Sequence, residues 1–528
     1  SGNDVVTGGD GADTITISTG NDNVDAGAGN DIMSITGLSN ADTITGGAGT
    51  DSLSITNSST GTLTPQFTSV ESLTVKTSTA FALNQTTATD TTSLVTFTIS
   101  STESTSDAIN LTLIASGSTV NISEDYSWDG SSSSDTDDTG DIGEVNISTI
   151  DGGTLTLNVG ADEDAVTHAD TTFSGVTDLT GAQTITINSK NADSNDIVNS
   201  LVALGLDDDE TQTVTINAED SAGITIGNVT NAAALQNLTI TSAAGAASTM
   251  GTMITATSLE SLSLSSTGSS SSLTTGVIGG TATAVLTDLT VSAASGSTTT
   301  TGVITSSGAT AMTSATVTAS DANSVAAIIG SLNMGTSAIA SFGITVADNA
   351  QLQYTAPTIT SGAITAGTLS FGDYSTITDI GSDGSEDLTL TGAVTTLTAS
   401  LGRGITNAAA DSIVLSGAVT TLNLSSTLGA EAIAMDTSND LAYAGAELIQ
   451  FGTITKATYT HTGTGTLSWV GDNIATNLVN SNASATTADT LEGGSANDVL
   501  KGNAGANIME GNAGNDSITG YAGADSIT

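Results

Sequence analysis

The sequence predicts an all-β protein built as a parallel β-helix or β-roll solenoid, in which successive coils of chain stack on one another. Three observations predict this fold. Carboxylates recur every ninth residue at both ends, short alternating strands recur through the middle, and the 528 residues favour strands and turns. Aromatic residues are only 3%, so the core must be built from Ala, Val, Ile and Leu. Thr, Val and Ile suit a pleated, half-buried surface, and the 59 glycines suit many turns.

The N-terminal segment, residues 1–56, contains a repeated nonapeptide. Residues 8–16 read GGDGADTIT, a complete G-G-x-G-x-D-x-U-x pattern in which U is a large apolar residue. The same register extends on both sides, and residues 46–54 (GGAGTDSLS) resume it after a two-residue insertion. The sixth position of these units holds Asp4, Asp13, Asp22, Asp31, Asp42 and Asp51.

The C-terminal segment, residues 486–528, repeats the device. It contains GGSANDVLK (493–501), GNAGANIME (502–510), GNAGNDSIT (511–519) and GYAGADSIT (520–528). Its sixth positions are Asp489, Asp498, Asn507, Asp516 and Asp525. Asn507 departs from the pattern, so a metal site at that turn is expected to be weaker or altered.

These nonapeptides resemble the RTX family, whose calcium-binding β-roll is built from such units. The resemblance implies Ca²⁺ as the cofactor, and it implies that the eleven sixth-position residues are the metal ligands. Calcium takes six to eight oxygen ligands, which Asp carboxylates and turn carbonyls can supply. Two nonapeptides would make one coil. The resemblance therefore implies the carboxylate pairs Asp4/Asp22, Asp13/Asp31, Asp22/Asp42 and Asp31/Asp51, and at the C-terminus Asp489/Asn507, Asp498/Asp516 and Asn507/Asp525.

The middle segment, residues 57–485, carries short alternating strands about 25 residues apart, which favours a solenoid, with further subdivision left open. An array of β-sandwiches is the competing interpretation, because short alternating strands also suit sandwiches. Asn or Ser next to the strands is expected to form a ladder from coil to coil. The central apolar residues that we align across coils are Leu155, Ile185, Val214, Leu238, Leu262, Leu289 and Ala315, and then Leu397 and Leu422.

Acidic clusters and one apolar stretch interrupt the middle segment. Within residues 123–144, Asp135, Asp137, Thr139 and Gly140 resemble the first half of an EF-hand loop, but Asn146 stands where the terminal Glu belongs. A solvated or partner-facing loop is the favoured interpretation there. Residues 161–168, 207–210 and 379–387 are weaker clusters. Residues 196–206 (DIVNSLVALGL) are predicted to form one short helix.

Charge and composition narrow the possible partners. The chain has 55 acidic residues against five basic ones, a net charge of −50. Such a charge repels itself, and bound divalent cations are the simplest means of neutralising it. Nucleic acid is excluded as a partner because no basic patch could meet phosphate. The chain has no cysteine and no apolar run long enough for a membrane span.

The motifs of common enzymes are missing. The two histidines, His168 and His461, cannot form an H-E-x-x-H zinc site, and no G-x-S-x-G elbow or phosphate-binding G-x-x-x-x-G-K-[ST] loop occurs. A surface or core role is favoured for His461. A polysaccharide-active β-helix enzyme remains a third alternative and predicts clustered carboxylates and aromatic residues on one wall.

The sequence therefore favours a non-enzymatic, extracellular structural protein that resembles RTX surface-layer proteins. Its expected partner is itself, in a calcium-dependent lattice or filament at the cell surface, and cell-surface polysaccharide is a candidate anchoring partner. The alternative is a calcium-dependent RTX adhesin or an extracellular filament subunit. Assembly contacts are expected at the solenoid ends, because an uncapped coil exposes unpaired strand edges.

Overall fold

The computed structural model describes the chain except for residues 58–60, 64–65, 78–80, 85–95, 102–108, 115–116, 125–144, 160–171, 174–177, 190–196, 208, 220–221, 254, 280–284, 307–310, 329, 337, 356–357, 380–386, 408–412, 428–431, 445 and 472–473. The chain forms two compact units, Ser1–Leu259 and Glu260–Thr528. Each unit is a parallel β-solenoid, as predicted. Among the described residues, no helix is long and apolar enough to cross a membrane.

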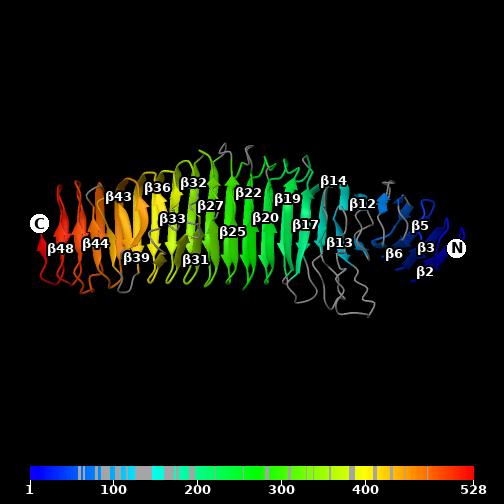
Figure 1. Cartoon of the computed structure of the whole chain (residues 1–528), viewed down its shortest axis with the longest axis horizontal. Coiled ribbons are helices and arrows are strands. Elements are labelled where there is room, and N and C mark those ends of the chain that lie inside the picture. The colour runs from blue at the N-terminus through cyan, green and yellow to red at the C-terminus, as the bar shows by residue number, and fades with distance from the viewer. Residues whose placement is uncertain are drawn as a thin grey trace. The chain divides into compact units, whose positions relative to one another are not determined.

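The first unit has one long wall, to which nearly every coil adds a strand (Figure 1). Its strands are β2 (Thr14–Ile17), β4 (Ile32–Thr36), β6 (Ser52–Asn57), β9 (Ser72–Thr77), β11 (Thr96–Ser101), β13 (Ser118–Glu124), β14 (Val145–Val159), β16 (Asp178–Ser189), β18 (Thr213–Ala218) and β20 (Asn237–Ala243).

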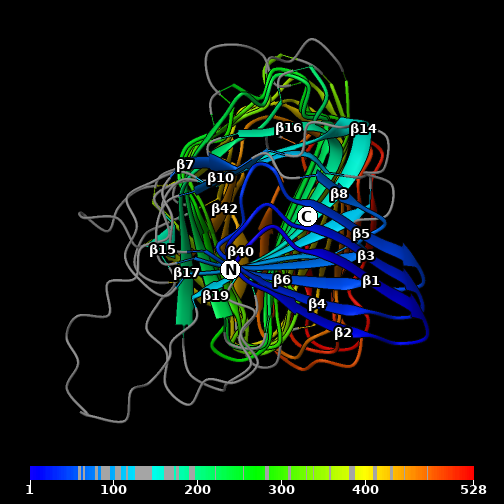
Figure 2. The ribbon, with the colours of Figure 1, turned by 90° about the vertical axis from the view of Figure 1, so that its right-hand side faces the viewer.

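The remaining strands of the first unit form shorter walls. They are β1 (Val5–Asp10), β3 (Asn23–Ala28), β5 (Thr43–Ala48) and β8 (Gln66–Thr68); then β7 (Gly61–Leu63), β10 (Phe81–Asn84) and β12 (Ile109–Ile114); and then β15 (Thr172–Phe173), β17 (Ile197–Gly205), β19 (Ala222–Thr230) and β21 (Ala247–Met250). Figure 2 shows β1, β3 and β5 following one another along one wall, and β2, β4 and β6 along the next.

The second unit has three walls. The first holds β22 (Ser261–Thr267), β24 (Asp288–Ala294), β27 (Met312–Ala319), β30 (Ile339–Val346), β33 (Ile364–Phe371), β36 (Val394–Leu401), β39 (Val419–Ser426), β43 (Ile454–His461), β45 (Thr476–Asn480), β47 (Val499–Lys501) and β49 (Ser517–Thr519). The second holds β23 (Ser272–Thr275), β25 (Thr298–Thr301), β28 (Val325–Ile328), β31 (Gln351–Tyr354), β34 (Thr376–Asp379) and β37 (Thr406–Asn407).

The third wall of the second unit contains an inserted three-stranded antiparallel meander. Its strands are β26 (Ile304–Thr305), β29 (Leu332–Asn333), β32 (Thr358–Thr360), β35 (Leu388–Leu390), β38 (Ile413–Leu415), β40 (Ile433–Met435), β41 (Asp440–Tyr443), β42 (Ala446–Phe451), β44 (Leu467–Val470), β46 (Thr490–Glu492), β48 (Ile508–Glu510) and β50 (Ser526–Ile527). The described pairings within each unit are parallel, apart from the antiparallel run β40–β41–β42.

The predicted strand register is confirmed within both units. In the first, Leu155 pairs with Ile185, Ile185 with Val214, and Val214 with Leu238. In the second, Leu262 pairs with Leu289 and Leu289 with Ala315, and Leu397 pairs with Leu422. All nine side chains are buried. Stacking like on like places one apolar residue of each coil in the core, which fixes the register.

An asparagine ladder runs along the long wall of the first unit, as predicted. The side-chain amide of Asn217 donates to Oδ1 of Asn188 at 3.0 Å, Asn188 donates to Asn158 at 2.9 Å, and Asn158 donates to Asn121 at 2.7 Å. Each inner amide is both donor and acceptor, so one residue type repeated at each coil satisfies its neighbours.

The predicted helix at residues 196–206 is wrong. Ile197–Gly205 forms β17, which pairs in parallel with both β15 and β19. The stretch is rich in Ile, Val and Leu, and its apolar residues alone do not distinguish a helix from a buried strand. The strands of the adjacent coils decide between the two, because they offer backbone partners only to an extended segment.

Candidate calcium sites

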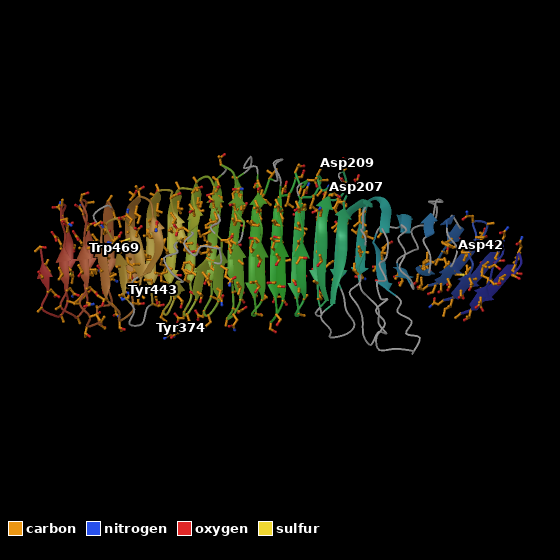
Figure 3. All side chains as sticks on the ribbon, in the orientation of Figure 1. Asp42, Asp207, Asp209, Tyr374, Tyr443 and Trp469 are labelled. Carbon is orange, nitrogen blue, oxygen red and sulfur yellow. The ribbon has the colours of Figure 1, made fainter. Side chains whose placement is uncertain are left out.

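The aspartates of the N-terminal roll (residues 1–57) stack in two columns. In each stacked pair, the backbone N–H of one aspartate donates to Oδ1 of the aspartate one coil later, at 2.7–2.8 Å. The structure thus brings together all four predicted pairs: Asp4 with Asp22, Asp13 with Asp31, Asp22 with Asp42, and Asp31 with Asp51. Figure 3 labels Asp42, which belongs to the first of these columns.

Local sequence explains this placement. In the inner nonapeptides of this roll, the apolar eighth residue points into the core, as the burial of Val24, Met33 and Leu53 shows. Since neighbouring side chains of a strand alternate between its two faces, the core position of the eighth residue fixes where the turn before it begins. The sixth residue ends that turn, so its carboxylate lies at the same corner of every coil.

The second carboxylate oxygen is buried without a hydrogen-bond partner at four of these turns. These atoms are Oδ2 of Asp13, Asp22, Asp31 and Asp51. A buried carboxylate oxygen without a donor is costly, and stacked like charges repel each other, by about 3 kcal/mol for unit charges about 5 Å apart at an effective dielectric constant of 20. A cation beside Oδ2 would remove both penalties.

At Asp13 and Asp51, the space beside Oδ2 is a cradle that only glycine leaves open. A Cβ added to Gly8 would lie 2.7 Å from Oδ2 of Asp13 and would also meet the carbonyl oxygen of Ala26 in the next coil. A Cβ added to Gly46 would lie 2.7 Å from Oδ2 of Asp51. Carboxylate and carbonyl oxygens that converge on a small space are the hard ligands that calcium prefers, so these residues fit the ion.

Few side chains would contribute to each site. Within the described part of the chain, no three His, Asp or Glu side chains converge on one position that could hold a metal. An ion in a nonapeptide turn would therefore take most of its oxygens from backbone carbonyls. The side chains would contribute one or two stacked carboxylates, and glycine would keep the turn free of a side chain that fills the site.

The column through Asp13, Asp31 and Asp51 continues one coil further, onto a residue that lies outside the nonapeptide pattern. The N–H of Asp51 donates to Oε2 of Glu71 at 2.7 Å, and the N–H groups of Glu71 and Ser72 both donate to the carbonyl of Asp51. A sequence signal exists, because Glu71-Ser72-Leu73 repeats the local pattern of Asp51-Ser52-Leu53. This likeness is weak in the sequence because no glycines directly precede Glu71 and because Glu is longer than Asp.

Glu71→Gln is expected to weaken calcium binding by the adjoining turn about three- to tenfold. Glutamine can still accept the N–H of Asp51, so only one carboxylate charge of the column is lost, and calcium affinity follows the number of charged ligands. Calcium titration followed by hydrogen exchange of residues 38–77 measures the effect. Asp25→Asn, which removes an exposed charge from the same roll, is the control. Equal shifts would show that Glu71 acts only through net charge.

The C-terminal roll (residues 486–528) stacks its sixth positions in the same way. The N–H of Asp489 donates to Oδ1 of Asn507 at 3.1 Å, that of Asp498 to Asp516 at 3.0 Å, and that of Asn507 to Asp525 at 2.9 Å. The structure thus brings together all three predicted C-terminal pairs. Added Cβ atoms at Gly493, Gly511 and Gly520 would each crowd Oδ2 of the aspartate five residues later.

Asp489 differs from the four N-terminal aspartates with an unpartnered Oδ2, because protein donors occupy both of its oxygens, as they also do at Asp42. Oδ1 accepts the N–H of Leu467 at 3.0 Å, and Oδ2 accepts from the Ser481 hydroxyl and, at 2.7 Å, from the Asn503 amide. Burial raises the pKa of Asp489, and the hydrogen bonds from Ser481 and Leu467 act in the opposite direction. Donors of this kind hold a carboxylate in place without a cation.

His461 belongs to the core of the second unit. Its Nδ1 lies 2.8 Å from the hydroxyl of Ser426, which also lies 2.9 Å from the hydroxyl of Tyr459. Burial lowers the pKa of His461, which favours the neutral ring. His461 is therefore a buried residue of the solenoid interior, as its alternating strand suggested.

The other acidic clusters contribute little to a site. Asp207 accepts the N–H of Gly181 with one oxygen and the N–H of Asp209 with the other, so it closes a loop (Figure 3). Residues 125–144, which include the EF-hand-like Asp135 and Asp137, lie outside the described residues, as do 161–168 with His168 and most of 379–387.

Comparison with known families gives a match at the two ends of the chain. Four copies of the RTX calcium-binding nonapeptide repeat match, over residues 1–33, 34–54, 485–518 and 502–528. They leave residues 55–484 uncovered, and no curated protein and no solved structure matches the chain. Repeats of this family typically bind Ca²⁺ and are typical of secreted proteins. The chain therefore carries RTX calcium-binding nonapeptide repeats at both ends, folded as stacked turns with the sixth residues in columns.

Proposed function

We propose that the protein is a secreted, non-enzymatic structural protein that folds on calcium and assembles with copies of itself into a layer at the cell surface. The observation that carries the proposal is the set of carboxylate columns with buried, unpartnered oxygens at Asp13, Asp22, Asp31 and Asp51. A cation beside these oxygens would complete the N-terminal roll. Parallel solenoid units, with nonapeptide turns near the two termini of the chain, suit a scaffold.

Calcium then makes folding depend on location. The chain has a net charge of −50 and no disulfide to stabilise it, so its calcium-free state is weakened by self-repulsion. Extracellular calcium modules bind with dissociation constants of about 10⁻⁴ to 10⁻³ M. Binding stabilises the folded state by mass action. Millimolar calcium outside the cell would fill the sites in these turns, and micromolar calcium inside the cell would leave the sites without ions.

Electron microscopy tests assembly directly. Purified protein is imaged in chelator and again after about 5 mM calcium is added, a concentration above the dissociation constants expected for such modules. Ordered sheets that appear only with calcium are the expected result. Filaments would favour the fibre-subunit alternative, and discrete particles that never associate would favour an adhesin module and contradict the surface layer.

A paired variant connects assembly to the columns. Asp22→Asn together with Asp31→Asn should prevent sheets at a calcium concentration at which Asp25→Asn still forms them. Asp22 and Asp31 are buried in the columns, whereas Asp25 is exposed on β3 of the same roll. Sheets formed equally well by both variants would show that the N-terminal columns do not control assembly.

A further inference from the structure

The side-chain amide of Asn507 occupies a cage of oxygen atoms. Its Nδ2 lies 3.0 Å from the carbonyl oxygen of Asn503, 3.1 Å from that of Gly505, 3.2 Å from that of Gly520 and 3.0 Å from Oδ1 of Asp525. An NH₂ group has two hydrogens, so these four acceptors share two donors. A cage of carbonyl and carboxylate oxygens is the kind of surrounding that calcium takes elsewhere.

The orientation of this amide is fixed by its other end. Oδ1 of Asn507 accepts the backbone N–H of Asp489 at 3.1 Å. If the amide were flipped, its NH₂ group would face that N–H, donor against donor, and its oxygen would face four other oxygens. The Asn507 side chain therefore presents hydrogens to the cage, and a nitrogen that carries hydrogens cannot ligate a metal ion.

The cage corresponds to the calcium cradle of an aspartate turn. At Asp13, the cradle is bounded by Gly8, which lies five residues earlier, and by the carbonyl oxygen of Ala26 in the next coil. At Asn507, the equivalent neighbours are Gly502, whose added Cβ would lie 2.8 Å from Nδ2, and the carbonyl oxygen of Gly520. Nδ2 of Asn507 thus stands where Asp13 has its buried Oδ2, which has no hydrogen-bond partner.

The same device occurs a second time, one coil before Asp498. The N–H of Asn477 donates to Oδ1 of Asp498 at 2.6 Å, and its Nδ2 lies 3.3 Å from the same oxygen and 3.4 Å from the carbonyl oxygens of Gly471 and Ile474. Oδ1 of Asn477 accepts the indole N–H of Trp469 at 3.0 Å, which fixes the orientation. Asn477 and Asn507 are both fully buried.

We propose that Asn507 takes the place of a calcium ion, so that the column Asp489–Asn507–Asp525 is held by hydrogen bonds and needs no metal. Asn477 does the same where Asp498 joins the preceding coil. Asp489, the first member of the column, is already satisfied by Ser481 and Asn503. Calcium control is then concentrated in the N-terminal roll, and one wall of the C-terminal roll stays ordered at low calcium. The inference rests on calcium binding by the aspartate turns and not on assembly.

Two reciprocal substitutions in the full chain test this. Asn507→Asp is expected to add one bound calcium ion per chain, because it restores a carboxylate to an intact cage, and Asp13→Asn is expected to remove one. Asn497→Asp is the control. It adds the same charge in the C-terminal roll at an exposed position outside the column, where an aspartate can still accept the N–H of Asn515. Equilibrium dialysis against radioactive calcium counts the ions.

Hydrogen exchange in chelator gives the second measurement. In the wild type, peptides that cover residues 502–510 should stay protected while peptides from residues 1–36 exchange. In Asn507→Asp, protection of residues 502–510 should fall at least tenfold in chelator and return with calcium. The proposal is overturned if Asn507→Asp binds no more calcium than the wild type, if calcium does not restore its protection, or if residues 502–510 of the wild type exchange as fast as residues 1–36. An unchanged ion count in Asp13→Asn would overturn the premise that the aspartate turns bind calcium.

Discussion

Gly27→Ala is expected to damage the N-terminal roll far more than Gly9→Ala. Gly9, Gly27 and Gly47 pair with one another across β1, β3 and β5, and their φ angles are +119°, +106° and +109°. A Cβ added to Gly27 would overlap the carbonyl group of Gly9, whereas one added to Gly9 would meet no atom within 4 Å. The two substitutions therefore share the backbone strain and differ only in the contact.

The difference between them measures how closely the coils approach. An alanine at positive φ costs about 1–3 kcal/mol, and both variants bear that cost. In Gly27→Ala the backbone must also move apart at a point where the N–H of Gly11 is bonded to the carbonyl of Ala28. We expect this to add at least about 3 kcal/mol, which raises the calcium midpoint for ordering the roll more than a hundredfold.

Hydrogen exchange of residues 1–57 during a calcium titration supplies this midpoint. Gly47→Ala should behave like Gly27→Ala, since an added Cβ there would overlap the carbonyl group of Gly27. Similar midpoints for Gly9→Ala and Gly27→Ala would show that the coils tolerate a methyl group between them, and that strain alone makes glycine necessary.

The stacking of the coils could be predicted from sequence because it depends on repeated local patterns. Asp13, Asp31 and Asp51 stack because each is followed by an apolar residue, two positions later, that must enter the core. Leu155, Ile185 and Val214 align for the same reason, since shifting a strand by one residue would expose its whole apolar face.

The features that sequence reasoning missed depend on neighbours that are distant in the chain. Ile197–Gly205 becomes a strand because β15 and β19 offer it backbone partners. Asn507 can be recognised as a departure from the pattern, but its role depends on whether its nitrogen or its oxygen faces the cage, and the N–H of Asp489 decides that. No local pattern records such a contact.

The antiparallel meander of β40, β41 and β42 illustrates the same limit. Residues 433–451 extend one coil of the second unit, and β38 pairs with β42 while β40 pairs with β44. The insertion adds two strands to one wall without breaking the parallel stacking on either side. In the sequence, this insertion only lengthens the interval between two anchored strands. In the structure, its strands satisfy one another's backbone groups.

Trp469→Ala is expected to lower the local stability of the coils before the C-terminal roll by about 3–5 kcal/mol, the usual cost of removing a fully buried tryptophan. Trp469 is completely buried, stacks on Tyr459 with ring centroids 5.4 Å apart, and donates its indole N–H to Oδ1 of Asn477. Figure 3 labels it on β44, in the C-terminal part of the second unit. The residue therefore combines a large packing contribution with one buried hydrogen bond.

Trp469→Phe separates these two contributions. Phenylalanine keeps a ring against Tyr459 but leaves Oδ1 of Asn477 without its donor, which should cost about 1–3 kcal/mol. Hydrogen exchange of residues 454–501 in saturating calcium, as urea is increased, gives the opening free energies. A loss for Trp469→Phe as large as that for Trp469→Ala would mean that the hydrogen bond dominates. Such a result would also make Trp469 essential to the metal-free junction at Asn477, because without the indole the amide is free to turn its oxygen toward Asp498 and require a cation there.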